Sequence, residues 1–198
     1  MTESFAEHVQ SWLRNLQDTI CHSLEQWDGT SKFHEDNWTR AEGGGGRTRV
    51  LENPSANGLF EKAGVNFSAV HGPVPAFLKE ELSKMPGEKV MDRDETFLAT
   101  GLSLVIHPFS PHVPIVHMNV RYFQVGDNHR WFGGGIDLTP AYVVPEDARH
   151  FHHTLKGVCD KHHPSYYQKF KSWADDYFFL PHRNETRGIG GIFFDRLG

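Results

Sequence analysis

The strongest constraint on the fold is a pair of neighbouring segments, residues 101–107 and 115–123, in which apolar and polar side chains alternate. The even positions of both segments are apolar, from Leu102 to Tyr122. The odd positions carry the polar side chains: Ser103, His107, His117, Asn119 and Arg121. Because successive side chains of a β-strand point to opposite faces, each segment is predicted to be a strand with one core face and one polar face.

Residues 108–114 form a connection between the two predicted strands that is short enough for a β-hairpin. Antiparallel pairing would place a hydroxyl, two imidazoles, an amide and a guanidinium on one patch. One interpretation of this patch is a solvated sheet face, which is common in antiparallel sheets. The face carries no Lys, Glu or Asp, and Ile115 and Phe123 lie at its ends. We therefore favour the second interpretation, a lined cavity.

Helices are predicted before and after these strands. Ser4 and Glu7 form a capping box ahead of an amphipathic run that Gly29 can end. Further helices are predicted at residues 75–85, 145–162 and 165–180, the last starting from a capping box at Ser165. Further strands are predicted at residues 47–51, 65–71, 97–107, 115–125, 136–142 and 188–194. This pattern indicates one α+β domain, residues 1–198, with a large, mostly antiparallel sheet covered by helices.

Composition excludes several classes of function. The net charge of -5 argues against a nucleic-acid partner, which would select a basic surface. Cys21 and Cys159 lie far apart and fit neither a disulfide framework nor a CxxC site, so we expect a reducing compartment. The N-terminal segment lacks a basic start and an apolar signal core, and no run approaches the ~18 apolar residues of a membrane span. We therefore expect a cytoplasmic protein.

Three consecutive glycines, Gly133–Gly135, come directly before the strand predicted at residues 136–142. Such glycines serve either as a plain bend or as a place where the backbone approaches a ligand closely. The pattern matches neither GxGxxG nor GxxxxGK[ST], which disfavours a nucleotide-phosphate loop. Asp137 lies next to large apolar residues, so its carboxyl group is a candidate catalytic acid or base.

Histidines concentrate in the second half of the chain, where ten of the fourteen lie at or after His107. On the helix predicted from Pro145, His152 shares a stripe with Leu155 and Cys159, which turns His152 inward. His182 lies in a predicted loop with Arg183 and Arg187. The two arginines could pair with carboxylates there, and a solvated loop is the alternative interpretation.

Five segments together resemble blocks of the oxygen-dependent coproporphyrinogen III oxidase family, in the same order and at similar spacing: residues 43–52, 101–107, 116–121, 131–140 and 182–195. The resemblance implies a sheet sandwiched between helices, a homodimer and a cytoplasmic role in porphyrin and haem biosynthesis. It also implies the reaction, which converts two propionates of coproporphyrinogen III to vinyl groups with O2 as the oxidant and gives protoporphyrinogen IX. No organic cofactor is expected.

The resemblance also implies roles for individual residues. His117 is expected to be a proton donor, and Asp137 is expected to lie near the pyrrole nitrogens, where it would help to remove a proton. The expected substrate contacts are Ser103, Asn119, Val120 and Arg121. Arg121, with Arg183 or Arg187, would hold propionates by charge-assisted hydrogen bonds.

A divalent metal is a further implication of the resemblance, with four histidines as its ligands: His107, His117, His152 and His182. The same four imidazoles could equally act as hydrogen-bonding and proton-transfer groups. Clustered histidines with a carboxylate also leave open a non-haem metal oxygenase. The family continues beyond Gly198 with more strands and a dimer-forming helix, so the domain is expected to be incomplete. A non-catalytic tetrapyrrole-binding fragment is therefore another alternative.

Overall fold

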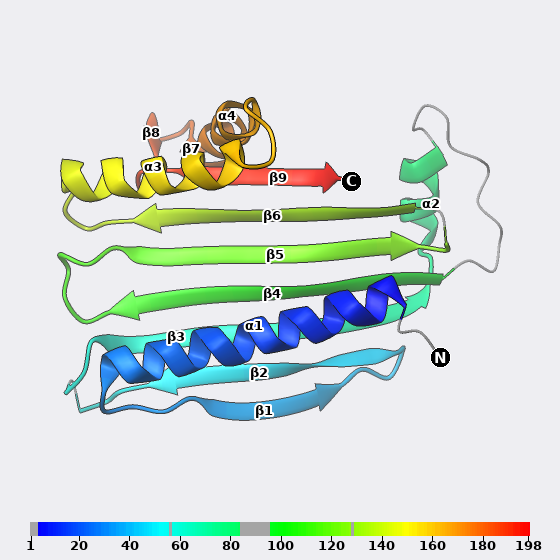
Figure 1. Ribbon diagram of the computed structural model, residues 1–198, viewed down its shortest axis with the longest axis horizontal. Helices are drawn as coiled ribbons and strands as arrows, with labels where there is room; N and C mark the ends of the chain where they lie inside the picture. The colour runs from blue at the N-terminus through cyan, green and yellow to red at the C-terminus, as the bar shows by residue number, and fades with distance from the viewer. Residues whose placement is uncertain (1–3, 56, 84–95, 128) are drawn as a thin grey trace.

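The computed structural model describes residues 4–55, 57–83, 96–127 and 129–198. Its centre is a seven-stranded antiparallel sheet with helices packed on it (Figure 1). The helices are α1 (Phe5–Asp28), α2 (Ala76–Ser83), α3 (Pro145–Asp160) and α4 (Tyr166–Phe178). The sheet order is β1 (His34–Thr39), β2 (Gly44–Glu52), β3 (Phe60–Pro73), β4 (Thr96–Pro108), β5 (Ile115–Val125), β6 (His129–Thr139) and β9 (Gly191–Leu197). The α+β prediction is confirmed.

Strands that follow one another in the chain also pair in the sheet, from β1 to β6. The predicted hairpin is confirmed, since β4 and β5 pair antiparallel with Ser103 opposite Asn119. After β6 the chain forms α3, α4 and a short separate ribbon of β7 (Phe179–Leu180) and β8 (Glu185–Thr186). It then returns as β9 alongside β6. Segments far apart in the sequence therefore meet at the β6 edge.

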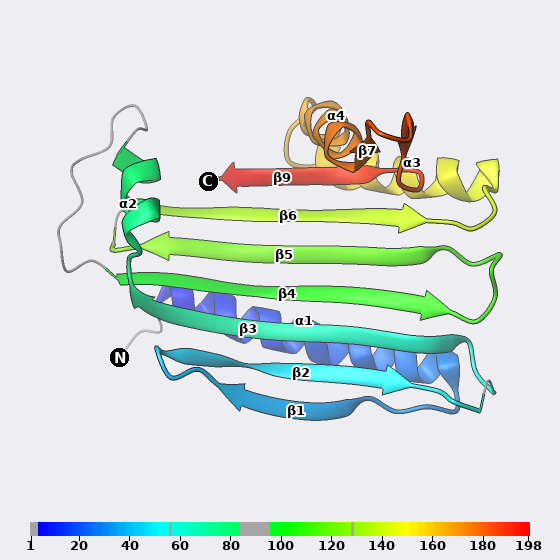
Figure 2. The same cartoon turned by 180° about the vertical axis from the view of Figure 1, so that it is seen from behind.

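The two faces of the sheet differ as predicted. Helix α1 crosses one face and packs mainly on β3 and β4, so Leu102, Leu104 and Ile106 belong to the main core (Figure 1). Figure 2 shows the opposite face, with α1 behind the sheet. Near the β9 edge, α4 packs against Phe193 and Phe194 through aromatic contacts. Covering an edge strand in this way protects it from pairing with another chain.

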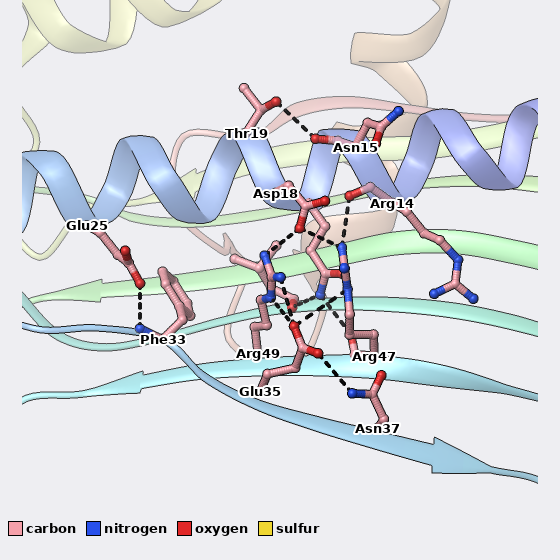
Figure 3. Close-up of polar contacts among 12 residues, drawn as sticks. Arg14, Asn15, Asp18, Thr19, Glu25, Phe33, Glu35, Asn37, Arg47 and Arg49 are labelled. Carbon is pink, nitrogen blue, oxygen red and sulfur yellow. Dashed lines mark hydrogen bonds and ion pairs between the residues drawn. The ribbon is translucent and has the colours of Figure 1, made fainter.

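A charged cluster ties α1 to the first two strands (Figure 3). Asp18 of α1 forms ion pairs with Arg47 at 2.8 Å and with Arg49 at 2.7 Å. Arg49 also forms an ion pair with Glu35 of β1 at 2.8 Å. Beside the cluster, the buried Gln17 amide donates to the Arg47 carbonyl oxygen at 2.7 Å. These contacts fix β1 and β2 under the helix.

Two details of the predicted fold are wrong. The glycines Gly133–Gly135 lie inside β6 instead of before it. Glycine is needed there because a Cβ on Gly134 would lie 2.8 Å from the Asn119 carbonyl oxygen, and a Cβ on Gly135 would lie 3.0 Å from the Ile192 carbonyl oxygen. Ser165 precedes α4 but makes no side-chain capping bond. Residues 84–85 of the helix predicted at 75–85 lie outside the described residues. No described helix combines the length and apolar character needed to cross a bilayer.

Asp28, at the end of α1, joins that helix to the start of β3. Its buried carboxylate accepts hydrogen bonds from the backbone N–H groups of Leu59 and Phe60 at 2.8 and 3.0 Å. It also accepts from the Ser31 N–H at 2.9 Å and the Thr30 hydroxyl at 2.8 Å. Burial raises the pKa of this carboxyl group, but the hydrogen bonds outweigh burial and hold the pKa well below its usual range.

We expect Asp28→Asn to lower the free energy of unfolding at pH 7 by about 1–3 kcal/mol, because buried N–H groups lose their partner. A lowered folded-state pKa gives stability that is full above the unfolded pKa of about 3.9 and is lost as the pH falls through the folded pKa. Urea unfolding between pH 7 and 2 should therefore show a flatter acid dependence for the variant. Parallel curves for the two proteins would contradict this role.

Candidate active site

The polar face of the sheet, opposite α1, carries a row of neutral hydrogen-bonding side chains across three strands. The strand register pairs Asn66 of β3 with Ser103 of β4, and Ser103 with Asn119 of β5. We call these three residues the polar row. On β6 the row continues with Gly135, which has no side chain. The row therefore ends beside the Phe193 ring of β9, which lies 3.1 Å from where a Cβ on Gly135 would be.

A hollow of about 280 Å³, the first hollow, lies on this face at the end of the polar row. The sheet, the end of α4 and the loop before β9 all contribute to its wall: Asn66, Ser103, His117, Asn119, Gly135, Asp137, Tyr177, Phe178, Arg187 and Phe193. Five of these were predicted as site residues from the sequence, namely Ser103, His117, Asn119, Asp137 and Arg187. The fold therefore brings a hydroxyl, an imidazole, an amide, a carboxylate and a guanidinium to one place.

Asp137 is the most deeply buried polar group of the first hollow, with 4% of its surface exposed. It lies opposite His117 in the β5–β6 register, and its Oδ2 is 3.2 Å from Nδ1 of that ring. The same oxygen accepts a hydrogen bond from Nη2 of Arg187 at 3.0 Å. A buried carboxylate costs several kcal/mol unless it is paired, so both partners stabilise its charge.

The contact with Asp137 fixes the proton on the His117 ring. An ionised carboxylate can only accept, so Nδ1 of His117 carries the hydrogen that points at Asp137. The other nitrogen, Nε2, is then the one that can take up or release a proton. The His117 side chain is 36% exposed, whereas the Asp137 side chain is 5% exposed. Of the two groups, the imidazole is therefore the one that a ligand in the first hollow can reach, and the carboxylate behind it fixes the orientation of the ring.

Arg187 reaches Asp137 because the loop before β9 is fixed at both of its ends. The Arg187 backbone N–H donates to the Phe178 carbonyl oxygen at 3.0 Å, and its guanidinium stacks 4.3 Å from the centre of the Phe178 ring. Further along, the Ile189 N–H donates to the Leu138 carbonyl oxygen at 3.0 Å. The loop is thus tied to α4 on one side and to β6 on the other.

His152 of α3 holds the same loop from the far side. Its Nε2 lies 2.9 Å from the Ile189 carbonyl oxygen, which can only accept, so Nε2 donates. Its Nδ1 lies 3.1 Å from the Tyr167 hydroxyl and accepts from it. Burial raises the pKa of the Tyr167 hydroxyl, which keeps that group protonated. The predicted inward orientation of His152 is confirmed, and both ring nitrogens have protein partners.

The four histidines expected as metal ligands lie in different parts of the fold. His117 lines the first hollow, His107 lies near the end of β4, and His182 is exposed between β7 and β8. A centre built from all four does not fit this arrangement, because His152 uses both nitrogens on Ile189 and Tyr167. Among the described residues, no three His, Cys, Asp or Glu side chains converge on a common point. A divalent metal stays a prediction.

The three remaining residues that were predicted to contact the substrate, Arg121, Val120 and Arg183, do not line the first hollow. Arg121 donates to Oδ1 of Asn119 at 2.9 Å, and its Nη2 lies 3.3 Å from Oδ1 of Asp195. Val120 packs against the core on the α1 side of the sheet. Arg183 is on the surface, 62% exposed, and pairs with Glu185 at 2.6 Å.

Several lining residues were not predicted from the sequence. Asn66 could have been predicted, because it lies between the apolar residues Val65 and Phe67. The polar residues of β4 show the same alternation with apolar neighbours. Tyr177 and Phe193 gave no such signal. They reach the hollow because α4 packs on β9, a contact that local sequence patterns do not encode.

We expect His152→Ala to loosen the loop before β9, because Ile189 loses the hydrogen bond to its carbonyl oxygen. Amide hydrogen exchange at Ile189 should become about five- to tenfold faster, the effect of one hydrogen bond of about 1 kcal/mol. His152→Gln can still donate to that oxygen and should keep most of the protection. His153→Gln, on the exposed face of α3, is the matched control. Equal exchange in all variants would contradict the positioning role.

Comparison with known proteins assigns a family to this arrangement. Residues 8–198 match the family described as coproporphyrinogen III oxidase. The chain is 48% identical to the mouse protein named oxygen-dependent coproporphyrinogen-III oxidase, mitochondrial, over 98% of the chain and 44% of the mouse protein. It is 52% identical to the rat protein of the same name, over 96% and 43%, and 46% identical to the Drosophila melanogaster oxygen-dependent coproporphyrinogen-III oxidase, over 98% and 50%. The chain spans about half the length of these relatives.

Proposed function

The chain belongs to the coproporphyrinogen III oxidase family, and on that premise we propose that it serves the oxygen-dependent oxidative decarboxylation of coproporphyrinogen III. Two propionate side chains would become vinyl groups, which gives protoporphyrinogen IX. The names of the mouse, rat and fly relatives support both the substrate and the oxidant. The observation that carries the proposal is the buried contact of Asp137 with His117 and Arg187 at the wall of the first hollow.

The chemistry requires a proton acceptor and an electron acceptor. Each propionate that becomes a vinyl group loses one CO2, one β-hydrogen and a pair of electrons, and O2 accepts that pair. The electron-rich pyrrole rings of the porphyrinogen can reduce O2 directly once a pyrrole N–H has lost its proton. No organic cofactor is then required for the electron transfer.

In this proposal the pair formed by Asp137 and His117 removes the pyrrole proton. Asp137 holds His117 so that Nε2 faces the hollow, and its negative charge stabilises the imidazolium that forms. The protonated His117 then serves as the proton donor to the reduced oxygen. Arg187 holds the Asp137 carboxylate in place, so the pair starts each turnover in the same geometry.

Arg121 is the proposed ligand of a propionate carboxylate. A guanidinium has five N–H donors, and the contacts with Asn119 and Asp195 leave others for a substrate. The contact with Asp195 is loose, since within the described residues its buried Oδ1 receives no hydrogen bond of good geometry. A propionate can therefore replace Asp195 as the partner of Arg121.

We also propose that the protein forms a homodimer and lies in the cytoplasm, because the resemblance to the family implies both. The mouse and rat relatives are named as mitochondrial proteins, so their names do not support the cytoplasmic location. Sedimentation of the purified protein and imaging of a tagged copy in its host cell are the measurements that address these two points.

We expect Asp137→Asn to lower the turnover of coproporphyrinogen III by about 10²–10⁴-fold, the usual contribution of a positioned acid–base group. Binding of coproporphyrin III, the stable oxidised ligand, should change by less than about threefold, because an amide in place of the carboxylate keeps the shape of the first hollow. Asp127→Asn, in the exposed turn after β5, is the matched control. Turnover close to that of the wild type in the Asp137→Asn variant would rule out the proposed role.

The same assay, run with and without a chelator, separates the other functions. A metal-dependent oxygenase would lose turnover when the chelator removes its ion. A tetrapyrrole-binding fragment without catalysis would bind coproporphyrin III and form no protoporphyrinogen IX. The proposed function predicts turnover that depends on O2.

A further inference from the structure

The first hollow is too small for the whole substrate. Its volume is about 280 Å³, whereas sites for organic ligands span roughly 300–1,000 Å³ and a tetrapyrrole with four propionates belongs to the upper part of that range. The first hollow can therefore take a reacting arm and part of one pyrrole ring. The rest of the ring system must lie on a neighbouring surface.

A second hollow of about 320 Å³ adjoins the first on the same face of the sheet. The two share all three residues of the polar row, Asn66, Ser103 and Asn119. A ligand in the first hollow can therefore extend over the polar row without leaving the protein. The second hollow reaches the opposite edge of the sheet, where Trp38 of β1 lies in its wall.

Five residues that are register partners on neighbouring strands form a row along the second hollow: Trp38, Gly46, Ser68, Gly101 and Arg121. All of them except Gly46 line the hollow itself. Gly101 has no side chain in the middle of the row, and Gly46 leaves room for the Trp38 indole, so the row forms a trough with an indole at one end and a guanidinium at the other. Four strand spacings separate the ends, which is about 19 Å. That length suits a macrocycle with an extended carboxylate arm.

Trp38 is held in place to act as the end wall of the trough. Its indole lies against Gly46 of β2, where any side chain would collide with the ring. The strand that carries it is fixed to α1 by the charged cluster around Glu35 and Arg49 (Figure 3). The residue is still 37% exposed, so one part of the indole packs on the protein and another part is available to a ligand.

We propose that the trough binds the tetrapyrrole ring, with one pyrrole ring against Trp38 and one propionate on Arg121, while the reacting arm lies in the first hollow. The hydroxyl groups of Thr48 and Ser68 line the second hollow and can accept hydrogen bonds from pyrrole N–H groups. Aromatic contacts between the indole and a pyrrole ring add binding free energy beyond the area buried. This inference rests on the proposed function and names where its substrate binds.

Two measurements on Trp38→Ala test the trough: titration with coproporphyrin III and the steady-state kinetics of coproporphyrinogen III. We expect Kd and KM to rise about five- to tenfold, with kcat within about twofold, because Trp38 is remote from Asp137. Trp38→Phe keeps an aromatic ring and should restore most of the binding. Trp27→Ala, exposed on α1 across the sheet, is the matched control.

Thermal unfolding would show whether Trp38→Ala folds. If it does not fold, a second variant that blocks the trough provides the test. Ser68→Leu fills the middle of the trough and leaves Trp38 unsubstituted, and it should raise KM for coproporphyrinogen III by a similar factor. A monopyrrole dicarboxylate such as porphobilinogen fits the first hollow alone, so its binding should not respond to Trp38→Ala.

The outcomes separate this inference from the proposed function. If the wild-type protein converts coproporphyrinogen III but both Trp38→Ala and Ser68→Leu leave Kd and KM unchanged, the trough is overturned and the proposed function stands. If the wild-type protein neither binds coproporphyrin III nor forms protoporphyrinogen IX, the proposed function fails and the trough fails with it.

Discussion

The ion pair between Asp137 and Arg187 joins strand β6 to a loop 50 residues later in the chain, and it gives a partner to a carboxylate whose side chain is only 5% exposed. Without Arg187, the buried Asp137 carboxylate would keep only His117 at 3.2 Å and the Thr139 hydroxyl at 3.5 Å as partners, with no guanidinium to offset its desolvation. The loop therefore has to be in place for the charge to be tolerated. Its bonds to Leu138 and His152 hold it there, so the fold and the candidate site depend on the same contacts.

The sheet explains how one side of the molecule can be a core and the other a binding surface. Helix α1 takes up the apolar side chains of the even positions, which leaves the hydroxyl, amide and imidazole groups on the open face. Glycines on β2, β4 and β6 keep that face low between the polar groups. A rigid strand pair then positions His117 against Asp137 with little freedom, as a proton-transfer pair requires.

The parts of the fold that sequence could predict are those with a strong local pattern. Alternation gave the bounds of β5 and the two faces of β4, and the capping box gave the start of α1. Strand β1 was missed because all six of its residues are exposed and do not alternate. Tyr177 and Phe193 were missed because their place in the site depends on α4 packing against β9, which is a contact between distant elements. The metal centre with four histidine ligands was predicted from the resemblance alone. In the structure, both ring nitrogens of His152 contact other protein groups, Ile189 and Tyr167.

The central claim is that this sheet face supports an O2-dependent loss of CO2 from propionate arms. Its most direct measurement is the release of labelled CO2 from coproporphyrinogen III that carries the label in its propionate carboxyl groups, in air and under strictly anaerobic conditions. The account predicts CO2 release in air that stops when O2 is removed. No release in air, or equal release without O2, would contradict it.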